Sequence, residues 1–252
     1  MVATSIQSLM KSGGKRFFFL TLDATAGRAL EADATKIIET NGGAVTGSVK
    51  HPINTADFSS FLLQAQATKP DVIVLANAGV DTVNSLKQAA EFGLTSGPNA
   101  IKVAGLLAMI NDIEALGLEF AHGVLVSESF YWDMNDATRA WAKRFRERTG
   151  AAPNMLEAAV YSSVLHYLKA VEKVGKTDGI PVAMAMKAAP INDMYSKDVH
   201  LSSDGRAVRD FYLFEVKGRA DSKGPWDDYK LLQTLPGDEA FPASASPCPL
   251  LK

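Results

Sequence analysis

The stretch RFFFLTLDATAGRALEADATKIIETNGG, residues 16–43, decides the fold. It opens with an apolar run, breaks at Asp23, and continues with helical spacing to a glycine pair. A strand, a small-residue turn and an amphipathic helix in this order form one β-α unit. The turn contains neither GxGxxG nor a Walker Gly-Lys-Ser/Thr motif, and Asp23 would repel a phosphate. The unit is therefore not a dinucleotide or triphosphate loop.

The same pattern continues along the chain, with strands recurring about every 27 residues. Strand-like segments lie at 44–52, 71–79, 101–109 and 124–132, and helical segments at 57–69, 81–94 and 111–123. The helix at 81–94 is expected to begin at an Asp81 N-cap and to end at Gly93. Such alternation is typical of βαβ units with right-handed crossovers. Residues 16–130 are predicted to form a doubly wound α/β domain with a five-stranded parallel sheet in the order 2-1-3-4-5.

The pattern changes after Asp133. Residues 136–150 predict a basic helix that begins at an Asp cap, 153–175 a longer apolar helix, and 180–188 a short helix. Strand-like segments at 209–219 and 228–236 could pair as a hairpin, and the tail from 237 onward is expected to be loop. The chain is therefore divided into an α/β lobe at 1–130 and a second region at 131–252.

Composition excludes some classes of partner. The 252 residues are 47% hydrophobic and 21% charged, and the net charge of −2 is spread over interspersed residues, so neither nucleic acid nor an anionic membrane is expected. No apolar run reaches the roughly 20 residues of a membrane helix. The N-terminus is not a secretory signal, because its charges follow the weak apolar stretch, so the chain as written is expected to stay where it is made. The single Cys248 can form no internal disulfide.

A ligand site is predicted where the strand order reverses, outside the carboxyl ends of strands 1 and 3. The turns there, 23–27 and 77–81, are small-residue turns that open helices, so backbone N–H groups face the crevice; they could also be plain connections. Strand 4 adds an apolar rim, and the aromatics at 129–133 could line a cleft or pack a hinge. The candidate ligand-binding residues are Ala24, Thr25, Ala26, Gly27, Asn77, Ala78, Gly79, Leu107, Ala108, Met109, Tyr131 and Trp132.

Catalytic patterns are weak. The four histidines are scattered without metal-ligand spacing, and His166 on the apolar face of a long helix is interpreted as a core or interface residue. The segment DVHLSSDGR, 198–206, is interpreted as a polar turn and not a triad, and no Gly-x-Ser-x-Gly elbow is present. No catalytic residue, metal or cofactor is predicted. The chain is expected to bind a ligand and not to be an enzyme.

Several stretches resemble the periplasmic substrate-binding proteins of ABC transporters, of the branched-chain amino acid receptor type. They include KSGGKRFFFLTLDATAG (11–27), DTVNSLKQAAEFGL (81–94), SESFYWD (127–133) and GPWDDYKLLQTLPGDEAF (224–241). The resemblance implies the type I periplasmic-binding fold, in which two α/β lobes joined by three crossings close over a ligand in an interlobe cleft. Residues 16–127 resemble the complete second lobe. The later helices and the hairpin would belong to an incomplete first lobe.

The sequence departs from that family in two ways. Such proteins begin with a signal peptide and a first lobe, so the resemblance implies that this chain is N-terminally truncated. The first turn has Ala24 and Ala26 where the family often has an aromatic, and strand 4 has Leu107, Ala108 and Met109 in place of an acidic residue. An apolar or aromatic acid is therefore expected as the solute in preference to a zwitterionic amino acid, with its carboxylate on the absent lobe.

These features are compatible with three functions. The leading hypothesis is the solute-binding component of an ABC uptake transporter, periplasmic by resemblance, with an ABC permease as its partner. The alternative is a cytoplasmic ligand-sensing regulatory domain of the same fold. An enzyme on a flavodoxin-like sheet would have to use Asp23 or Asp81. Because no first lobe would cover the apolar helix at 158–174, a homodimer through this helix, or low local stability, is also expected.

Overall fold

The computed structural model describes residues 2–98 and 100–241. The prediction of a loop at 242–252, and Cys248 with it, lies outside the described residues. The chain forms two compact units. Unit 1 contains the residues up to Glu128 together with Tyr212–Thr234, and unit 2 contains Ser129–Phe211 together with the described residues from Leu235 on. The backbone therefore passes between the units three times, as the resemblance implied.

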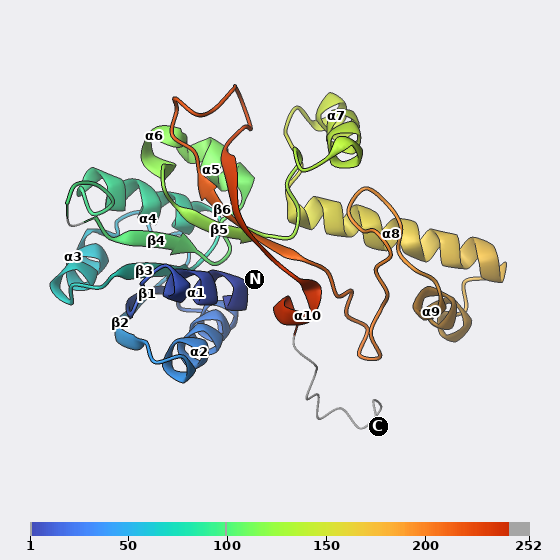
Figure 1. Cartoon of the computed structure of the whole chain (residues 1–252), viewed down its shortest axis with the longest axis horizontal. Coiled ribbons are helices and arrows are strands. Elements are labelled where there is room, and N and C mark those ends of the chain that lie inside the picture. The colour runs from blue at the N-terminus through green and yellow to red at the C-terminus, as the bar shows by residue number, and fades with distance from the viewer. Residues whose placement is uncertain (1, 99, 242–252) are drawn as a thin grey trace. The chain divides into compact units, whose positions relative to one another are not determined.

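Unit 1 is built on one twisted sheet (Figure 1). Its parallel part has the order β2-β1-β3-β4-β5, as predicted. The C-terminal strands extend this sheet to seven strands, because β6 pairs antiparallel with β5 and β7 follows β6. The two strands thus join the α/β sheet although the sequence places them in the second region. The strands are β1 (Arg16–Leu22), β2 (Ala44–His51), β3 (Val72–Ala76), β4 (Lys102–Gly105), β5 (Leu125–Glu128), β6 (Phe211–Val216) and β7 (Tyr229–Leu235).

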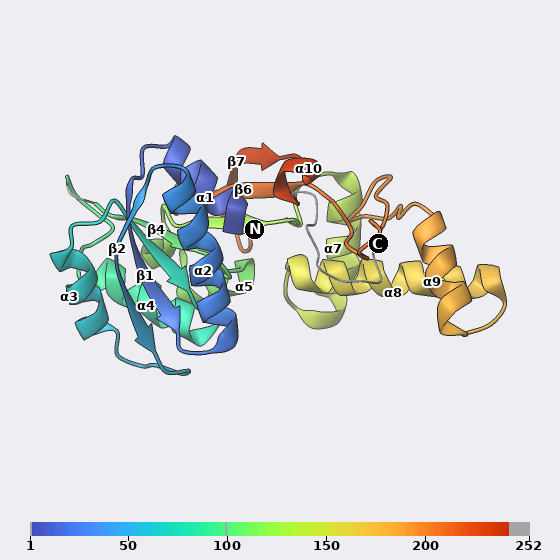
Figure 2. The same ribbon diagram turned by 90° about the horizontal axis from the view of Figure 1, so that it is seen from below.

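Helices cover both faces of the sheet. Figure 2 shows α1 (Val2–Lys11) and α2 (Thr25–Thr40) on one side, and α3 (Ser59–Ala67) and α4 (Val80–Glu91) on the other. Because side chains alternate along a strand, Phe17 and Phe19 of β1 join the core beneath α1 and α2. All five residues of β3 are buried, as expected for a strand covered on both faces.

Some elements of unit 1 differ from the prediction. Helix α1 was not predicted, yet its Ile6 and Leu9 are fully buried; its buried face also carries serine and threonine, which hides the apolar periodicity. The helix expected at 111–123 divides at Gly117, whose φ of 83° ends α5 (Ile110–Leu116) before α6 (Leu118–Ala121). The Asp81 N-cap is wrong: α4 begins at Val80 with Gly79 as its N-cap.

Unit 2 contains the helices α7 (Asp136–Thr149), α8 (Met155–Val174), α9 (Gly179–Ala188) and α10 (Gly237–Ala240). The expected Asp cap of α7 is wrong, because Asn135 caps it through Thr138 N–H. Helix α8 is capped by Asn154, and α9 lies beside its C-terminal half (Figures 1 and 2). The loop expected from residue 237 onward is wrong at its start, because Gly237–Ala240 form the short helix α10. In the described residues, no helix is both long and apolar enough to cross a bilayer.

Candidate functional site

Three turns meet at one edge of the unit 1 sheet, which we call the carboxyl edge. Strands β1, β3 and β4 are parallel neighbours, and each ends just before a predicted turn, at Leu22, Ala76 and Gly105. The turns at 23–27, 77–81 and 106–110 therefore lie side by side. This confirms the prediction that the three turns lie on one edge of the sheet. Their role in ligand binding stays a prediction.

The helices that begin at this edge have open N-termini. The N-cap residues of α2 and α4 are Ala24 and Gly79, and neither provides a side-chain hydrogen bond to its helix. By contrast, α7 and α8 in unit 2 are capped by asparagines. The first N–H groups of α2 and α4 are thus left for solvent or a ligand, at the positive ends of two helix dipoles. Thr25, Ala26 and Ala78 are exposed beside these donors.

Gly27 lies buried beneath the first turn. An added Cβ there would be 2.3 Å from the Leu22 carbonyl oxygen and 3.0 Å from that of Ala76. Glycine is therefore required for α2 to pack against the ends of β1 and β3. Gly79 is different: its φ is +59°, and an added Cβ would meet nothing within 4 Å.

A buried polar network supports the second turn. The Asn77 side chain is 1% exposed; its Oδ1 accepts from Thr82 Oγ1 at 2.9 Å, and its Nδ2 lies 3.1 Å from His51 Nε2. His51 Nδ1 lies 2.9 Å from the Pro52 carbonyl oxygen, which can only accept, so Nδ1 carries the proton and Nε2 accepts from Asn77. Asn77 therefore shapes the turn from below. Sequence analysis did not find this network; the only signal was a histidine at the end of a strand.

The loop after β2 is fastened to α4. The Asp81 carboxylate accepts N–H groups from Asn54 and Thr55, at 3.2 and 2.8 Å. Asn84 Nδ2 donates to the Thr55 carbonyl at 3.0 Å, and Gln88 Oε1 accepts from Phe58 N–H at 2.7 Å. Asp81 is thus a structural carboxylate that holds the loop at 54–55 beside the second turn.

The third turn provides an apolar rim. Leu107 and Met109 are half-buried, and Ala108 is buried against Gly105. Met109 N–H donates to Asp112 Oδ2 at 3.0 Å. Burial raises the pKa of the Asp112 carboxyl, and the Met109 N–H opposes this shift. The rim therefore offers methyl and thioether groups next to the open helix ends.

Three carboxylates of the described residues lie near the carboxyl edge, and each already has a partner within the protein. Asp23 is in an exposed ion pair with Arg28 at 2.7 Å, and Asp81 holds the loop described above. Glu128, at the end of β5, is 1% exposed and accepts from Tyr229 OH at 2.8 Å. Burial, with the Glu128 charge, raises the pKa of Tyr229. An ammonium group of a ligand would thus have to compete with these partners for a carboxylate at this edge.

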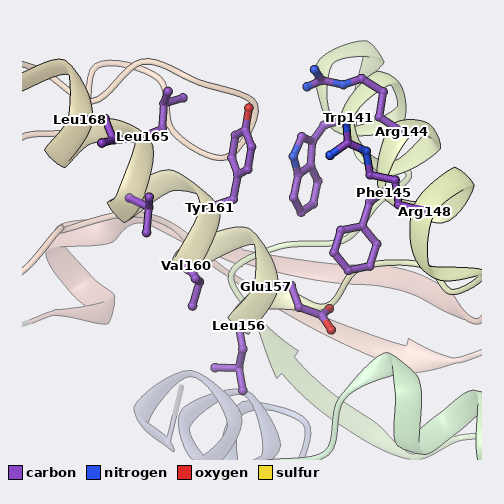
Figure 3. A pocket seen from close by; sticks show the side chains of 11 residues that line it. Trp141, Arg144, Phe145, Arg148, Leu156, Glu157, Val160, Tyr161, Leu165 and Leu168 are labelled. Atoms are coloured by element: carbon purple, nitrogen blue, oxygen red, sulfur yellow. The ribbon is translucent and has the colours of Figure 1, made fainter. Parts of the chain in front are cut away.

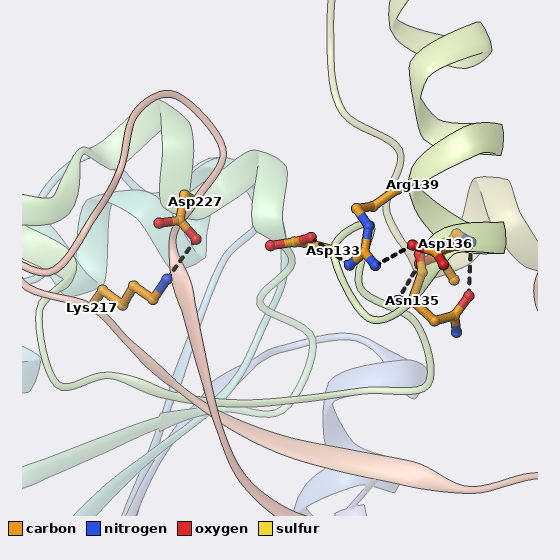
Figure 4. Close-up of polar contacts among 7 residues, drawn as sticks. Asp133, Asn135, Asp136, Arg139, Lys217 and Asp227 are labelled. Atoms are coloured by element: carbon orange, nitrogen blue, oxygen red, sulfur yellow. Dashed lines mark hydrogen bonds and ion pairs between the residues drawn. The ribbon is translucent and has the colours of Figure 1, made fainter.

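Tyr131 and Trp132, the last candidates, lie in unit 2. Their rings are tilted with centroids 5.8 Å apart, and the Arg146 guanidinium lies 5.7 Å from the Trp132 ring centroid. Arg139 joins Asp133 and Asp136 at 3.0 and 2.7 Å (Figure 4). The aromatic segment is thus packed within its own unit next to a charged turn.

Unit 2 also contains an apolar groove between α7 and α8, with a volume of about 770 Å³ (Figure 3). Trp141 forms its inner wall and contacts Tyr161 and Phe145, with ring centroids 5.3 and 5.5 Å apart. Large apolar side chains on the outer face of α8 are 38–63% exposed: Leu156, Val160, Tyr161, Val164, Tyr167 and Leu168. This face corresponds to the apolar helix singled out from the sequence.

The other polar candidates have structural roles. His166 is 5% exposed, and its Nε2 lies 2.9 Å from the Met186 carbonyl oxygen, which confirms the prediction of a satisfied core histidine. Residues 198–206 form a tight polar turn in which Asp204 bonds Arg206 at 2.7 Å. Within the described ranges, no group of three or more His, Cys, Asp or Glu residues could hold a metal.

The comparisons with known proteins agree on the class. The family model described as a periplasmic binding protein matches residues 1–224. A periplasmic binding protein from Burkholderia mallei is 45% identical with a TM-score of 0.93, and the match covers 100% of this chain and 66% of that one. A branched-chain amino acid ABC transporter periplasmic ligand-binding protein from Burkholderia xenovorans is 38% identical with a TM-score of 0.88, covering 100% and 67%. No curated protein matches the chain.

More distant structures share the fold alone. One is a solute-binding protein of an ABC transporter from R. palustris in complex with benzoate, at 20% identity and a TM-score of 0.79, covering 92% of this chain and 62% of that one. The chain belongs to the periplasmic binding protein family, and its relatives include ABC transporter proteins of the branched-chain amino acid type. It spans about two thirds of the length of the relatives it matches.

Proposed function

We propose that this chain is part of the solute-binding component of an ABC uptake transporter, that it acts in the periplasm, and that it delivers its solute to an ABC permease. Family membership over residues 1–224 supports this proposal. The solute is an organic acid that contacts the carboxyl edge of unit 1, through Ala24, Thr25, Ala26, Ala78, Gly79 and the Leu107–Met109 rim, whereas Asn77 supports the second turn from below.

The observation that carries this proposal is the pair of uncapped helix N-termini at Ala24 and Gly79. Open N–H groups at two positive helix ends favour an anionic or strongly polar ligand group, and the ion pair with Arg28 offsets the Asp23 charge that would repel a carboxylate there. The rim at Leu107 and Met109 favours an apolar body next to it. Because the neighbouring carboxylates are engaged, a simple carboxylate fits better than a zwitterionic amino acid. A small aromatic acid combines these features.

A pair of glycine variants tests the site. Gly79→Ala places a Cβ on the exposed carboxyl edge. Gly123→Ala is a matched control: its φ is +78°, its Cβ would also meet nothing within 4 Å, and it precedes β5 at the opposite edge. Calorimetric titration of the full chain with benzoate, and with leucine for comparison, measures affinity. We expect Gly79→Ala to weaken benzoate binding about tenfold, or roughly 1.4 kcal/mol, and Gly123→Ala to leave it unchanged. Equal affinities for both variants, or preference for leucine, would contradict the proposed site and ligand class.

A further inference from the structure

A pair of acidic side chains joins α5 to the loop between β6 and β7, all within unit 1. The Asp228 carboxyl is hydrogen-bonded to that of Glu114, and Asp228 is only 2% exposed. Glu114 Oε2 also accepts the Trp226 N–H at 3.1 Å. Two carboxyl groups can share a hydrogen bond only when one of them carries a proton, because a carboxylate has no donor.

The surroundings of the pair are acidic. Asp227 faces it from the loop, but is engaged by Lys217 Nζ at 2.5 Å (Figure 4) and by Lys223 N–H at 2.8 Å. The buried Tyr229 on β7, which is hydrogen-bonded to Glu128 on β5, also senses the charges of Asp228 and of Asp112 on α5. Among the described residues, Asp228 Oδ2 has no hydrogen-bond partner. Lys217 is thus the main cation opposing several buried carboxyls.

We propose that Asp228 carries a proton in the folded chain and donates it to the Glu114 carboxylate, and that this hydrogen bond helps to hold the 218–228 loop against α5 and is lost at alkaline pH. Loss of the proton replaces this hydrogen bond by two neighbouring carboxylate charges at a buried site, which is unfavourable. The loop is therefore docked at acidic pH and loosened at alkaline pH. This property does not depend on the proposed transport function.

The direction of the effect follows from proton binding. Burial is the main cause that raises the pKa of Asp228 to about 7; the Glu114 charge and hydrogen bond and the Asp227 charge add to the shift, and Lys217 opposes it. The ordinary pKa of an aspartate, 3.8, represents the unfolded chain. Between these two values the folded chain holds a proton that the unfolded chain has lost. The contribution of the pair to stability is therefore fully present below about pH 4 and falls as the pH rises to about 7.

Urea unfolding of the full chain from pH 5 to pH 8.5 tests the proposal. Asp228→Asn mimics the protonated carboxyl without titrating, and Asp221→Asn changes an exposed aspartate of the same loop as a control. We expect the folding constant of the unaltered chain to fall, relative to Asp228→Asn, about tenfold per pH unit between about pH 5 and pH 7. The Asp221→Asn variant should follow the unaltered chain.

Hydrogen exchange of the 218–228 loop, corrected for intrinsic rates, gives a second readout. Protection should decrease between pH 6 and pH 8 in the unaltered chain and persist in Asp228→Asn. Parallel stability curves for the unaltered chain and Asp228→Asn, or pH-independent protection of the loop, would overturn the proposal. If Asp228→Asn does not fold, the pH dependence of exchange in the 218–228 loop of the unaltered chain, compared with Asp221→Asn, decides alone.

Discussion

The two glycines at the carboxyl edge serve different purposes, although both occur in small-residue turns. Gly27 lets a helix approach the carbonyl oxygens of two strand ends, whereas Gly79 lets the backbone adopt a positive φ beside open space. The sequence identified both as turn glycines. It could not separate them, because the neighbours of Gly27 come from strands that are distant in sequence.

We expect Gly27→Ala to destabilise unit 1. The new Cβ would lie 2.3 Å from a backbone oxygen that cannot rotate away, so the helix must shift, at a cost of about 1–3 kcal/mol. Gly179→Ala at the start of α9 is the control, since an added Cβ there meets nothing within 4 Å and φ is not positive. Urea denaturation of both variants checks this. A Gly27→Ala variant as stable as the control would show that α2 does not pack as described.

Side-chain direction was the weakest part of the prediction at this scale. Asn77 was expected at the site, but its amide points into a buried network with His51 and Thr82. Asp81 was expected to cap α4 and instead holds the loop at 54–55. Both residues are polar and follow strand 3, so their placement at the carboxyl edge was predictable. Their partners lie beyond a neighbouring strand, which local sequence does not reveal. The ligand role of the candidate residues stays a prediction.

At the scale of elements, the parallel strands were the most predictable features. Their β-branched and aromatic runs recur between helical segments, and this local pattern is sufficient to predict a βαβ sheet. The pairing of β6 with β5 was not predictable, because a hairpin pattern does not state which sheet it joins. Helix α1 escaped notice since polar residues such as Thr4 and Ser5 lie on its buried side.

Helix α8 carries a prediction of its own. Its outer face exposes Val160 by 63% and Val164 by 50%, so covering this face with a second copy would remove apolar surface from water. We expect the 252-residue chain to self-associate through it. Sedimentation velocity should show a dimer for the unaltered chain and a monomer for Val160→Glu. Because Val160 is exposed, the substitution should change unfolding free energy by less than about 0.5 kcal/mol at low concentration.

The control for this prediction lies on a different helix. Leu63→Glu on α3 changes a side chain that is 60% exposed, outside the α8 face, and should leave the dimer intact. Hydrogen exchange complements sedimentation. A monomer whose protection at 158–174 equals that of the parallel sheet would show that the chain stabilises this face alone.

At the scale of the whole molecule, the family is established and the solute is a proposal. The chain matches the periplasmic binding protein model over residues 1–224 but spans about two thirds of its relatives. The three passages of the backbone between the units agree with the family resemblance. What unit 1 offers by itself is one surface with two open helix ends and an apolar rim. The central claim is that this surface, and not the groove of unit 2, contacts an organic acid.

Titration of the isotope-labelled full chain with benzoate, followed by amide NMR shifts, tests this claim most directly. The account predicts the largest shifts at the first-turn amides of α2 and α4, Thr25–Gly27 and Val80–Thr82, with smaller changes at Leu107–Met109. Shifts concentrated around Trp141 and Tyr161 in the α7–α8 groove would contradict it, as would a spectrum that does not change.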